Sequence, residues 1–194
     1  MIFLKNDYSL GAHPRIMEAL NRTNMEYTDG YGIDPYCRMA TEKIRKLIDA
    51  PDSRVYFLPG GTLTNITAIA AFLRPHQAVI SAETGHICVH ETGAIEATGH
   101  KIIHISSDDG KITPEDIRRV MLFHEDEHYV LPKLVYVSNT TETGNVYTEE
   151  EFQGLRKVCN EYGLLLYLDG ARIAMALTAE RNDLALADLP KFFD

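Results

Sequence analysis

The sequence has no tryptophan, only three cysteines and a shortage of positive charge. Cys37, Cys88 and Cys159 are odd in number and widely spaced, which is typical of reduced cytosolic thiols and not of a disulfide framework. Lys and Arg number 19 against 28 Asp and Glu, which gives a net charge of -9. Nonspecific nucleic-acid binding needs a basic face. We therefore expect no nucleic-acid partner.

Long apolar runs are also missing. No segment approaches the roughly 20 residues that cross a membrane, and the first seven residues reach charge too early for a signal peptide. We expect a soluble, cytoplasmic protein without a membrane partner. No Pro/Gly/Ser-rich linker interrupts the 194 residues, and 45% hydrophobic with 24% charged residues is a globular composition.

The chain does have a regular alternation of strand-like and helix-like segments. Helical spacing predicts helices over 14–20, 38–48, 62–73, 86–97, 114–123 and 148–162. Short apolar runs predict strands over 55–58, 78–81, 101–105, 134–138 and 164–168. Residues 185–194 show no closing element. This order predicts an α/β fold of three layers, α/β/α, around a mostly parallel sheet, with ligands at the carboxyl ends of the strands.

The most informative segment is the apolar run 164–168, which leads into Asp169 and a Gly-Ala-Arg172 turn. Such a strand is buried on both faces, and an acid at its end lies at the carboxyl edge of the sheet. A carboxylate there is costly to bury without a cationic partner. That partner is either a protonated ring nitrogen or Arg172 itself. The segment suggests a ligand that carries a cationic ring nitrogen and a carboxylate.

Gly60, Gly61 and Thr62 join a predicted strand to a predicted helix. Glycines let the backbone approach a ligand closely, and a helix start offers unpaired N–H groups and the positive end of the helix dipole. Gly61 and Thr62 are therefore candidates for a phosphate seat. The alternative is a glycine turn in which Thr62 caps the helix.

His86 begins the next predicted helix at the same edge. A histidine in this place either covers the face of a flat aromatic ligand or caps the helix. His86, His90 and Glu91 are residue types that bind metals, but their order departs from the H-E-x-x-H motif and no third ligand is evident. We expect no metal. Residues 138–144 follow another strand, and their polar side chains either line the site or form a turn.

Together these segments resemble the pyridoxal-phosphate enzymes of the threonine aldolase and β-eliminating lyase group, which have the fold type I of aspartate aminotransferase. The matching stretches are Lys5-Asn-Asp7, Gly30-Tyr31-Gly32, Pro59 to Asn65, Gly85 to Gly93 and Leu168 to Arg172. The resemblance spans nearly the whole chain. The ordered combination of a histidine with a later Asp-Gly-Ala-Arg is fairly specific.

The resemblance implies roles for individual residues. Gly61 and Thr62 correspond to the phosphate seat, His86 to the residue stacked on the cofactor ring, Asp169 to the partner of the pyridine nitrogen, and Arg172 to the ligand of the substrate carboxylate. Tyr31 corresponds to a residue near the site, in some cases of a neighbouring subunit. The implied catalytic residues are His86 and Asp169. The cofactor is pyridoxal 5'-phosphate, the substrate a small amino acid, and the assembly a homodimer or homotetramer.

Two departures accompany the resemblance. Typical aldolases carry a histidine after Asn-Thr in the loop that follows Val137, whereas this chain has Thr140-Thr141-Glu142. The family's Schiff-base lysine lies beyond the next strand in a Gly-Gly-Thr-Lys-like turn, and none of the eight lysines here matches it. We therefore expect a fragment of a longer enzyme that is inactive alone. Residues 1–50 are predicted to form an N-terminal arm with helices, and 51–194 part of the cofactor-binding large domain.

The expected reaction is of the threonine aldolase type, which converts L-threonine to glycine and acetaldehyde. One alternative keeps the cofactor and changes the reaction to β-elimination or amino transfer, and product identity separates these cases. The other alternative is a non-catalytic fragment that associates with itself or with a full-length copy.

Overall fold

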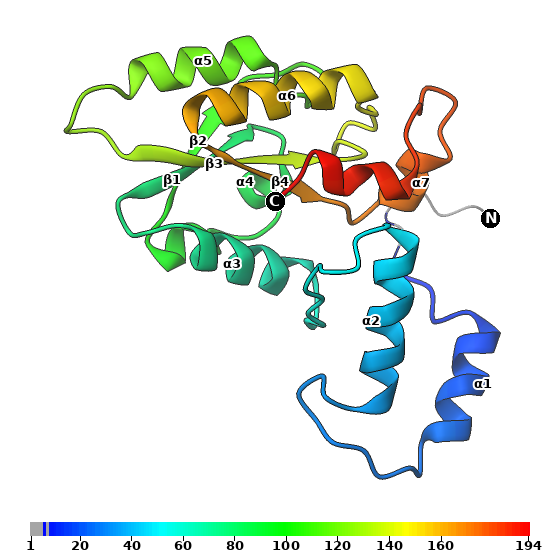
Figure 1. Ribbon diagram of the computed structural model, residues 1–194. Coiled ribbons are helices and arrows are strands. Elements are labelled where there is room, and N and C mark those ends of the chain that lie inside the picture. Colours follow the sequence, from blue (N-terminus) through cyan, green and yellow to red (C-terminus); the bar gives the residue numbers. More distant parts are fainter. Residues whose placement is uncertain (1–5, 7) are drawn as a thin grey trace. The chain divides into compact units, whose positions relative to one another are not determined.

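The computed structural model describes residue 6 and residues 8–194 (Figure 1). These residues fall into two compact units that divide between Ala40 and Thr41. The first unit contains α1 (Pro14–Thr23) and the start of α2 (Pro35–Leu47), which crosses the division. The predicted assignment of an arm to 1–50 and of a large domain to 51–194 stays a prediction. Among the helices of the described residues, none combines the length and apolarity needed to span a membrane.

The second unit is built on a four-stranded parallel sheet with the order β2-β1-β3-β4. The strands are β1 (Gln77–Ala82), β2 (Lys101–Ile105), β3 (Leu131–Ser138) and β4 (Leu165–Asp169). The chain moves outward from β1 to β2 and then returns across β1 to β3, so the direction of winding reverses between β1 and β3. Ligands of such sheets bind outside the carboxyl ends of the strands at this reversal.

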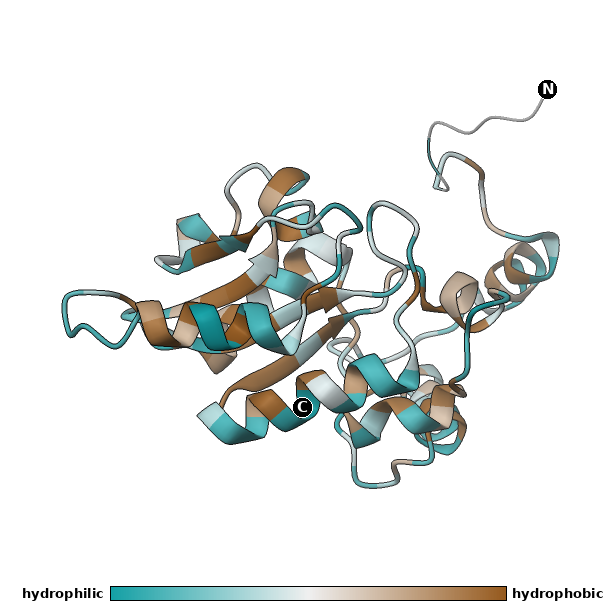
Figure 2. Ribbon diagram, turned by 90° about the horizontal axis from the view of Figure 1, so that it is seen from above, coloured by the Kyte–Doolittle hydropathy of each residue, from teal (hydrophilic) through white to brown (hydrophobic). Residues whose placement is uncertain are grey.

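Helices cover both faces of the sheet (Figure 1). Helices α5 (Pro114–Phe123) and α6 (Glu149–Tyr162) pack on one face, while α3 (Gly61–Phe72) and α4 (His86–Val89) pack on the other. Neighbouring strand residues divide between the two cores: Ile80 packs with α5 and α6, whereas Val79 packs with α3 and α4. This alternation is the period of two that a strand imposes. The predicted three-layer α/β/α class is confirmed, and Figure 2 shows the apolar strands between helices of mixed polarity.

Most predicted helices and strands form close to their predicted bounds. Two helices begin with capping boxes, in which the N-cap hydroxyl and the carboxylate three residues later each accept a backbone N–H of the other. These are Thr113 with Asp116 at α5 and Thr148 with Glu151 at α6. The remaining elements are η1 (Glu96–Thr98), α7 (Ile173–Leu177) and η2 (Leu186–Lys191).

Three expectations about local structure were wrong. Residues 55–58 form no strand, because their side chains are largely exposed and no described strand pairs with them. The helix predicted over 86–97 ends at Val89, since Thr92 (φ 55°) and Gly93 (φ 73°) adopt left-handed backbone that a helix cannot contain. Residues 185–194, expected to lack a closing element, contain the 3-10 helix η2.

Candidate functional site

The carboxylate of Asp169 is held by three donors where β4 ends. Its Oδ2 atom accepts the hydroxyl of Tyr136 at 2.6 Å and the side-chain amide of Asn65 at 3.2 Å. Its Oδ1 atom accepts the backbone N–H of Ala171 at 3.0 Å. The donors come from β3, from α3 and from the turn after β4, so the orientation of this acid is fixed by three separate parts of the second unit.

Asn65 joins this carboxylate to a second one. It is buried in the second turn of α3, and its Nδ2 atom donates to Oε1 of Glu91 at 2.7 Å as well as to Asp169. Its Oδ1 atom accepts the hydroxyl of Tyr167 at 2.9 Å. One amide therefore stands between two acids at the carboxyl edge of the sheet and reduces their mutual repulsion by donating to both.

Glu91 fixes the ring of His86, the first residue of α4. The Nδ1 atom of His86 lies 2.7 Å from Oε1 of Glu91, which also accepts Asn65. Because Oε1 acts as an acceptor, we assign the proton of this bond to Nδ1, which leaves Nε2 without a proton in the neutral ring. The side chain of Glu91 is 0% exposed and that of His86 is 35% exposed. Within the described residues, the buried Oε2 of Glu91 has no hydrogen-bond partner.

The start of α3 is open to an anion. Its N-cap is Gly60, with φ 115° and ψ 159°, a backbone region that is essentially restricted to glycine. No side chain caps this helix start, and a Cβ atom added at Gly60 or Gly61 would meet nothing within 4 Å. The first N–H groups of a helix have no carbonyl of that helix to bind. Thr62 is the second helical residue, so the alternative in which it caps the helix was wrong.

A third carboxylate, Glu142, lies in the loop after β3. Its Oε1 atom accepts the hydroxyl of Ser138 at 2.8 Å and the backbone N–H of His86 at 2.9 Å. The hydroxyl of Ser138 is in turn 3.5 Å from that of Tyr136. Glu142 therefore links the loop after β1 to the loop after β3, at the reversal of the winding direction.

The two tyrosines beside Asp169 stay protonated donors. Burial, and then the charge of Asp169, raises the pKa of Tyr136 far above the ordinary tyrosine value. Burial followed by the charges of Asp169 and Glu91 raises the pKa of Tyr167 as well. The two rings lie 5.7 Å apart between centroids, at an interplanar angle of 31°. An uncharged phenol donor next to a carboxylate is thus maintained over the whole physiological pH range.

The structure brings most of the predicted site residues together. His86 and Asp169 are connected through Glu91 and Asn65, and Gly61 and Thr62 begin the helix that carries Asn65. Arg172 is the N-cap residue of α7, three positions beyond Asp169. Tyr31 belongs to the first unit, where its ring is exposed and its φ is 60°. Lys5 and Asp7 of the first matching stretch lie outside the described residues.

Sequence reasoning assigned no role to Asn65, Glu91 or Tyr136 as members of this network. A signal exists for Asn65, because it is one helical turn after Gly61 and therefore on the same face of α3. Glu91 drew attention only as a possible metal ligand. Among the described residues, no group of three or more His, Cys, Asp or Glu side chains could hold a metal ion.

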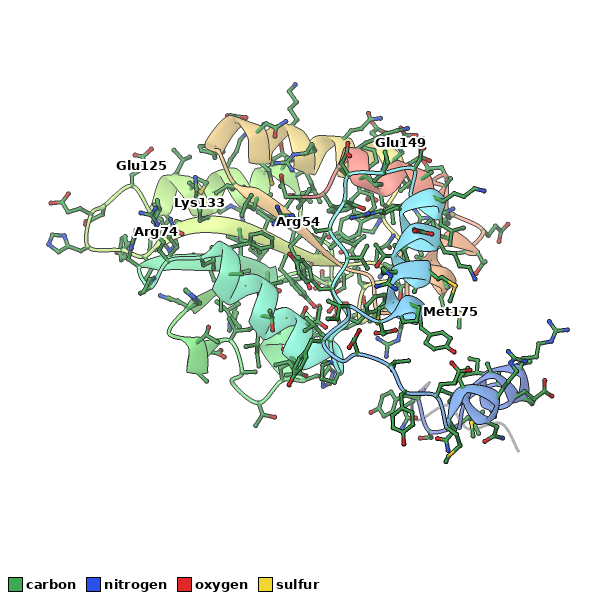
Figure 3. The ribbon with its side chains drawn as sticks, turned by 60° about the horizontal axis from the view of Figure 1, so that its bottom comes forward. Arg54, Arg74, Glu125, Lys133, Glu149 and Met175 are labelled. Carbon is green, nitrogen blue, oxygen red and sulfur yellow. The ribbon has the colours of Figure 1, made fainter. Side chains whose placement is uncertain are left out.

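Two lysines whose amines have partners, Lys133 and Lys111, are engaged away from this edge, and a third, Lys191, donates to Asp188 in η2. Lys133 is near the start of β3 and donates to the carbonyl of Gly163. In Figure 3 the labels of Lys133 and Arg74 both lie at the end of the second unit that is far from Met175 of α7. Lys111 is paired with Glu151 at 2.7 Å. Neither amine is therefore placed to reach Asp169.

Comparisons with known proteins agree with this arrangement. The family model for beta-eliminating lyases matches residues 7–194. The low-specificity L-threonine aldolases of a Pseudomonas species and of Pseudomonas aeruginosa are each 35% identical over 176 residues, which is 90% of this chain and 50% of the relative. The chain thus spans about half the length of these curated relatives.

A solved structure of Leishmania major threonine aldolase is 49% identical, with a TM-score of 0.96. The match covers 97% of this chain and 55% of that one. The resemblance seen in the motifs is confirmed over nearly the whole sequence. By its family match, its fold and its relatives, this chain belongs to the beta-eliminating lyase family.

Proposed function

We propose that this chain forms part of a pyridoxal-phosphate-dependent lyase that cleaves a β-hydroxy-α-amino acid such as L-threonine to glycine and an aldehyde. The observation that carries the proposal is the network from His86 through Glu91 and Asn65 to Asp169, at the carboxyl edge of the sheet. The relatives named threonine aldolase support the choice of reaction.

The donor set fits this cofactor group by group. A ring nitrogen that carries a proton requires a fixed anion, and Asp169 is an acid whose two oxygens are oriented by three donors. A phosphate requires unpaired N–H groups, and the start of α3 has no side-chain cap and open space at Gly60 and Gly61. The ring of His86 is held at its edge by the hydrogen bond from Nδ1 to Glu91. This leaves the face of the imidazole for contact with a flat ring.

The cofactor, when bound, supplies an electron-withdrawing ring conjugated to the α-carbon of the substrate. The residues of the chain then have separate tasks. Asp169 holds the proton on the ring nitrogen by its charge, and Asn65 and Tyr136 keep its carboxylate in position. His86 covers the ring and excludes water from that face. Arg172 binds the carboxylate of the substrate.

The remaining proposals concern the whole protein. We propose that the lysine that binds the cofactor covalently lies outside residues 1–194, since none of the eight lysines here occupies the expected motif. Tyr31 is proposed to approach the site of a neighbouring subunit in a homodimer or homotetramer. A cytoplasmic location agrees with the odd number of scattered cysteines.

The test uses the full-length protein that contains this sequence, purified with pyridoxal phosphate. We expect glycine and acetaldehyde from L-threonine, measured by chromatography and by a coupled aldehyde assay. Asp169→Asn should lower cleavage by at least about 100-fold, because the charge opposite the ring nitrogen is lost. Asp126→Asn, in the exposed loop after α5, is the matched control. A keto acid as the main product would overturn the proposal in favour of elimination or amino transfer.

A further inference from the structure

Three carboxylates at the carboxyl edge of the sheet, those of Asp169, Glu91 and Glu142, are linked by hydrogen bonds through Asn65 and His86, and their surroundings differ. Both oxygens of Asp169 accept hydrogen bonds. Glu91 has a fully buried side chain, with Oε1 bonded to Asn65 and His86 and with Oε2 enclosed in protein. Neither acid has an oxygen that is both unbonded and accessible. An acid that exchanges a proton with a substrate needs such an oxygen within hydrogen-bond reach.

Glu142 is the acid of this group that has one. Its Oε1 atom is anchored by the hydroxyl of Ser138 and by the backbone N–H of His86. Its Oε2 atom has no hydrogen-bond partner among the described residues. It is also not one of the buried polar atoms that lack a partner, so it is accessible to solvent. The residue as a whole is half-buried. One oxygen is therefore fixed by hydrogen bonds to Ser138 and His86, and the other is free to bind a substrate group.

Ser138 and the N–H of His86 also determine where the carboxylate of Glu142 lies. Ser138 is the register partner of Asp169, and its hydroxyl lies 3.5 Å from the phenol of Tyr136, which binds Asp169. His86 supplies both the ring proposed to cover the cofactor and the N–H that holds Glu142. The carboxylate of Glu142 is consequently bonded directly to the backbone of His86 and linked to Asp169 through Ser138 and Tyr136, the neighbourhood of the two residues that are proposed to contact the cofactor.

We propose that Oε2 of Glu142 is the general base that accepts the proton of the substrate's β-hydroxyl group, an assignment that rests on the function proposed above. The electron pair of the broken O–H bond becomes the second C–O bond of the departing aldehyde. The Cα–Cβ bond breaks, and its electron pair remains on Cα, where the addition of a proton gives glycine. The proton taken up by Glu142 balances the proton added at Cα.

A purely structural role makes a different prediction. In Glu142→Gln, the amide oxygen can still accept the bonds from Ser138 and His86, so a cap that only holds two loops together should survive. The amide cannot take a proton from an alcohol. The Gln variant therefore separates the two roles. Glu83→Gln is the matched control, because Glu83 is an exposed acid in the loop after β1 whose side chain accepts the hydroxyl of Ser106.

The experiment uses the full-length protein with bound pyridoxal phosphate and three readouts. Threonine cleavage should fall by about 100-fold or more in Glu142→Gln, recover in part in Glu142→Asp, and not change in Glu83→Gln. Exchange of the α-hydrogen of glycine in deuterated water, followed by NMR, should persist in Glu142→Gln, since glycine has no hydroxyl group. Thermal unfolding should show similar midpoints for Glu142→Gln and the unsubstituted protein, since the amide oxygen can still accept the bonds from Ser138 and His86.

The outcomes distinguish a failure of the proposed lyase function from a failure of the role proposed for Glu142. If the unsubstituted protein does not exchange glycine, the proposed function is overturned. If it does, and Glu142→Gln cleaves threonine at the unsubstituted rate, the role of Glu142 is overturned alone. Loss of the thermal unfolding transition in Glu142→Gln, together with full cleavage activity in Glu142→Ala, would also overturn it.

Discussion

The hydroxyl of Tyr136 lies 2.6 Å from Oδ2 of Asp169, on adjacent parallel strands. Tyr136 is opposite Tyr167 in the register, and Asp169 is two residues beyond Tyr167, so both side chains lie on the same face of the sheet. The bond therefore depends on the register between β3 and β4. A shift by one residue would turn the acid to the other face, where α5 and α6 pack.

Tyr136→Phe removes this donor and leaves the ring in place. A hydrogen bond to a charged group contributes about 1.5 to 3 kcal/mol, so we expect a loss of that order in the free energy of unfolding, measured with urea. The affinity for pyridoxal phosphate should fall as well. Tyr129→Phe is the control, because Tyr129 is half-exposed and stacks on Phe123. Equal effects of the two substitutions would contradict the assignment.

Asn65→Leu should destabilise the fold strongly although the two side chains are similar in size. It preserves most of the volume but leaves Glu91 and Asp169 without the amide between them. We expect a loss of about 3 kcal/mol in unfolding free energy, because a buried charge loses its donor. Thr67→Ala, at an exposed position of the same helix, should change stability by less than about 0.5 kcal/mol. A Leu variant as stable as the parent would show that the network is dispensable.

Glu91 is predicted to decide which ring nitrogen of His86 carries the proton. In the unsubstituted protein we expect the Nδ1–H form, observed by two-dimensional ¹⁵N NMR of labelled histidine. Glu91→Leu removes the acceptor, so the Nε2–H form should become populated. His100→Gln serves to assign the signals of His100, which is buried, in the spectrum. Dominance of the Nε2–H form in the unsubstituted protein would contradict the hydrogen bond from Nδ1 of His86 to Glu91.

Gly60→Ala tests the backbone at the start of α3. The φ of 115° is strained for any residue with a Cβ atom, so the variant should lose about 1 to 3 kcal/mol in unfolding free energy. Nothing lies within 4 Å of the added methyl group, so a steric clash would not be the cause. Gly11→Ala has the same open space without a positive φ and should be neutral. Similar midpoints of urea unfolding for Gly60→Ala and Gly11→Ala would contradict the predicted backbone strain at residue 60.

Stability should decline at alkaline pH. Burial raises the pKa of Tyr136, Tyr147 and Tyr167 from the ordinary value of 10.0, and that of Cys159 from 9.0 to about 12. The folded state binds these protons more tightly than the unfolded chain does. Their contribution is therefore complete below pH 9 and is lost as the pH rises toward the folded values.

We expect the unfolding free energy, measured with urea from pH 7 to 11, to begin to fall near pH 9, by up to about 1.4 kcal/mol per pH unit for each group. Cys159→Ala should weaken the decline between pH 9 and 10, to which Cys88 also contributes because burial raises its pKa, and leave the later decline unchanged. A flat profile up to pH 11 would mean that these side chains are less buried than the structure has them.

Much of this fold could be predicted because its signals are local. The caps of α5 and α6 and the apolar runs of β1 to β4 each depend on a few adjacent residues. The failures also have local causes: residues 55–58 have the composition of a strand but no neighbouring strand, and Thr92 and Gly93 interrupt an otherwise helical pattern. Asp169 and His86 were predicted at the site because each follows a recognisable strand.

The connections between these residues could not be predicted in the same way. Asn65 meets Glu91 across 26 residues and Asp169 across 104. No spacing rule relates such positions, because their proximity is set by how α3 packs on the sheet. Tyr136 reads as one more apolar strand residue until the register with β4 is known.

The long separation in sequence between Asn65 and Asp169 affects the order in which the fold forms. Contacts between distant parts of a chain form late in folding, because the intervening loop must first be closed. Helix α3 and the capped helices need only local contacts, whereas the amide of Asn65 meets Asp169 after β1, β3 and β4 have paired. During refolding, helical circular dichroism should therefore return before the binding of pyridoxal phosphate that we propose, and this binding would mark the last stage of assembly.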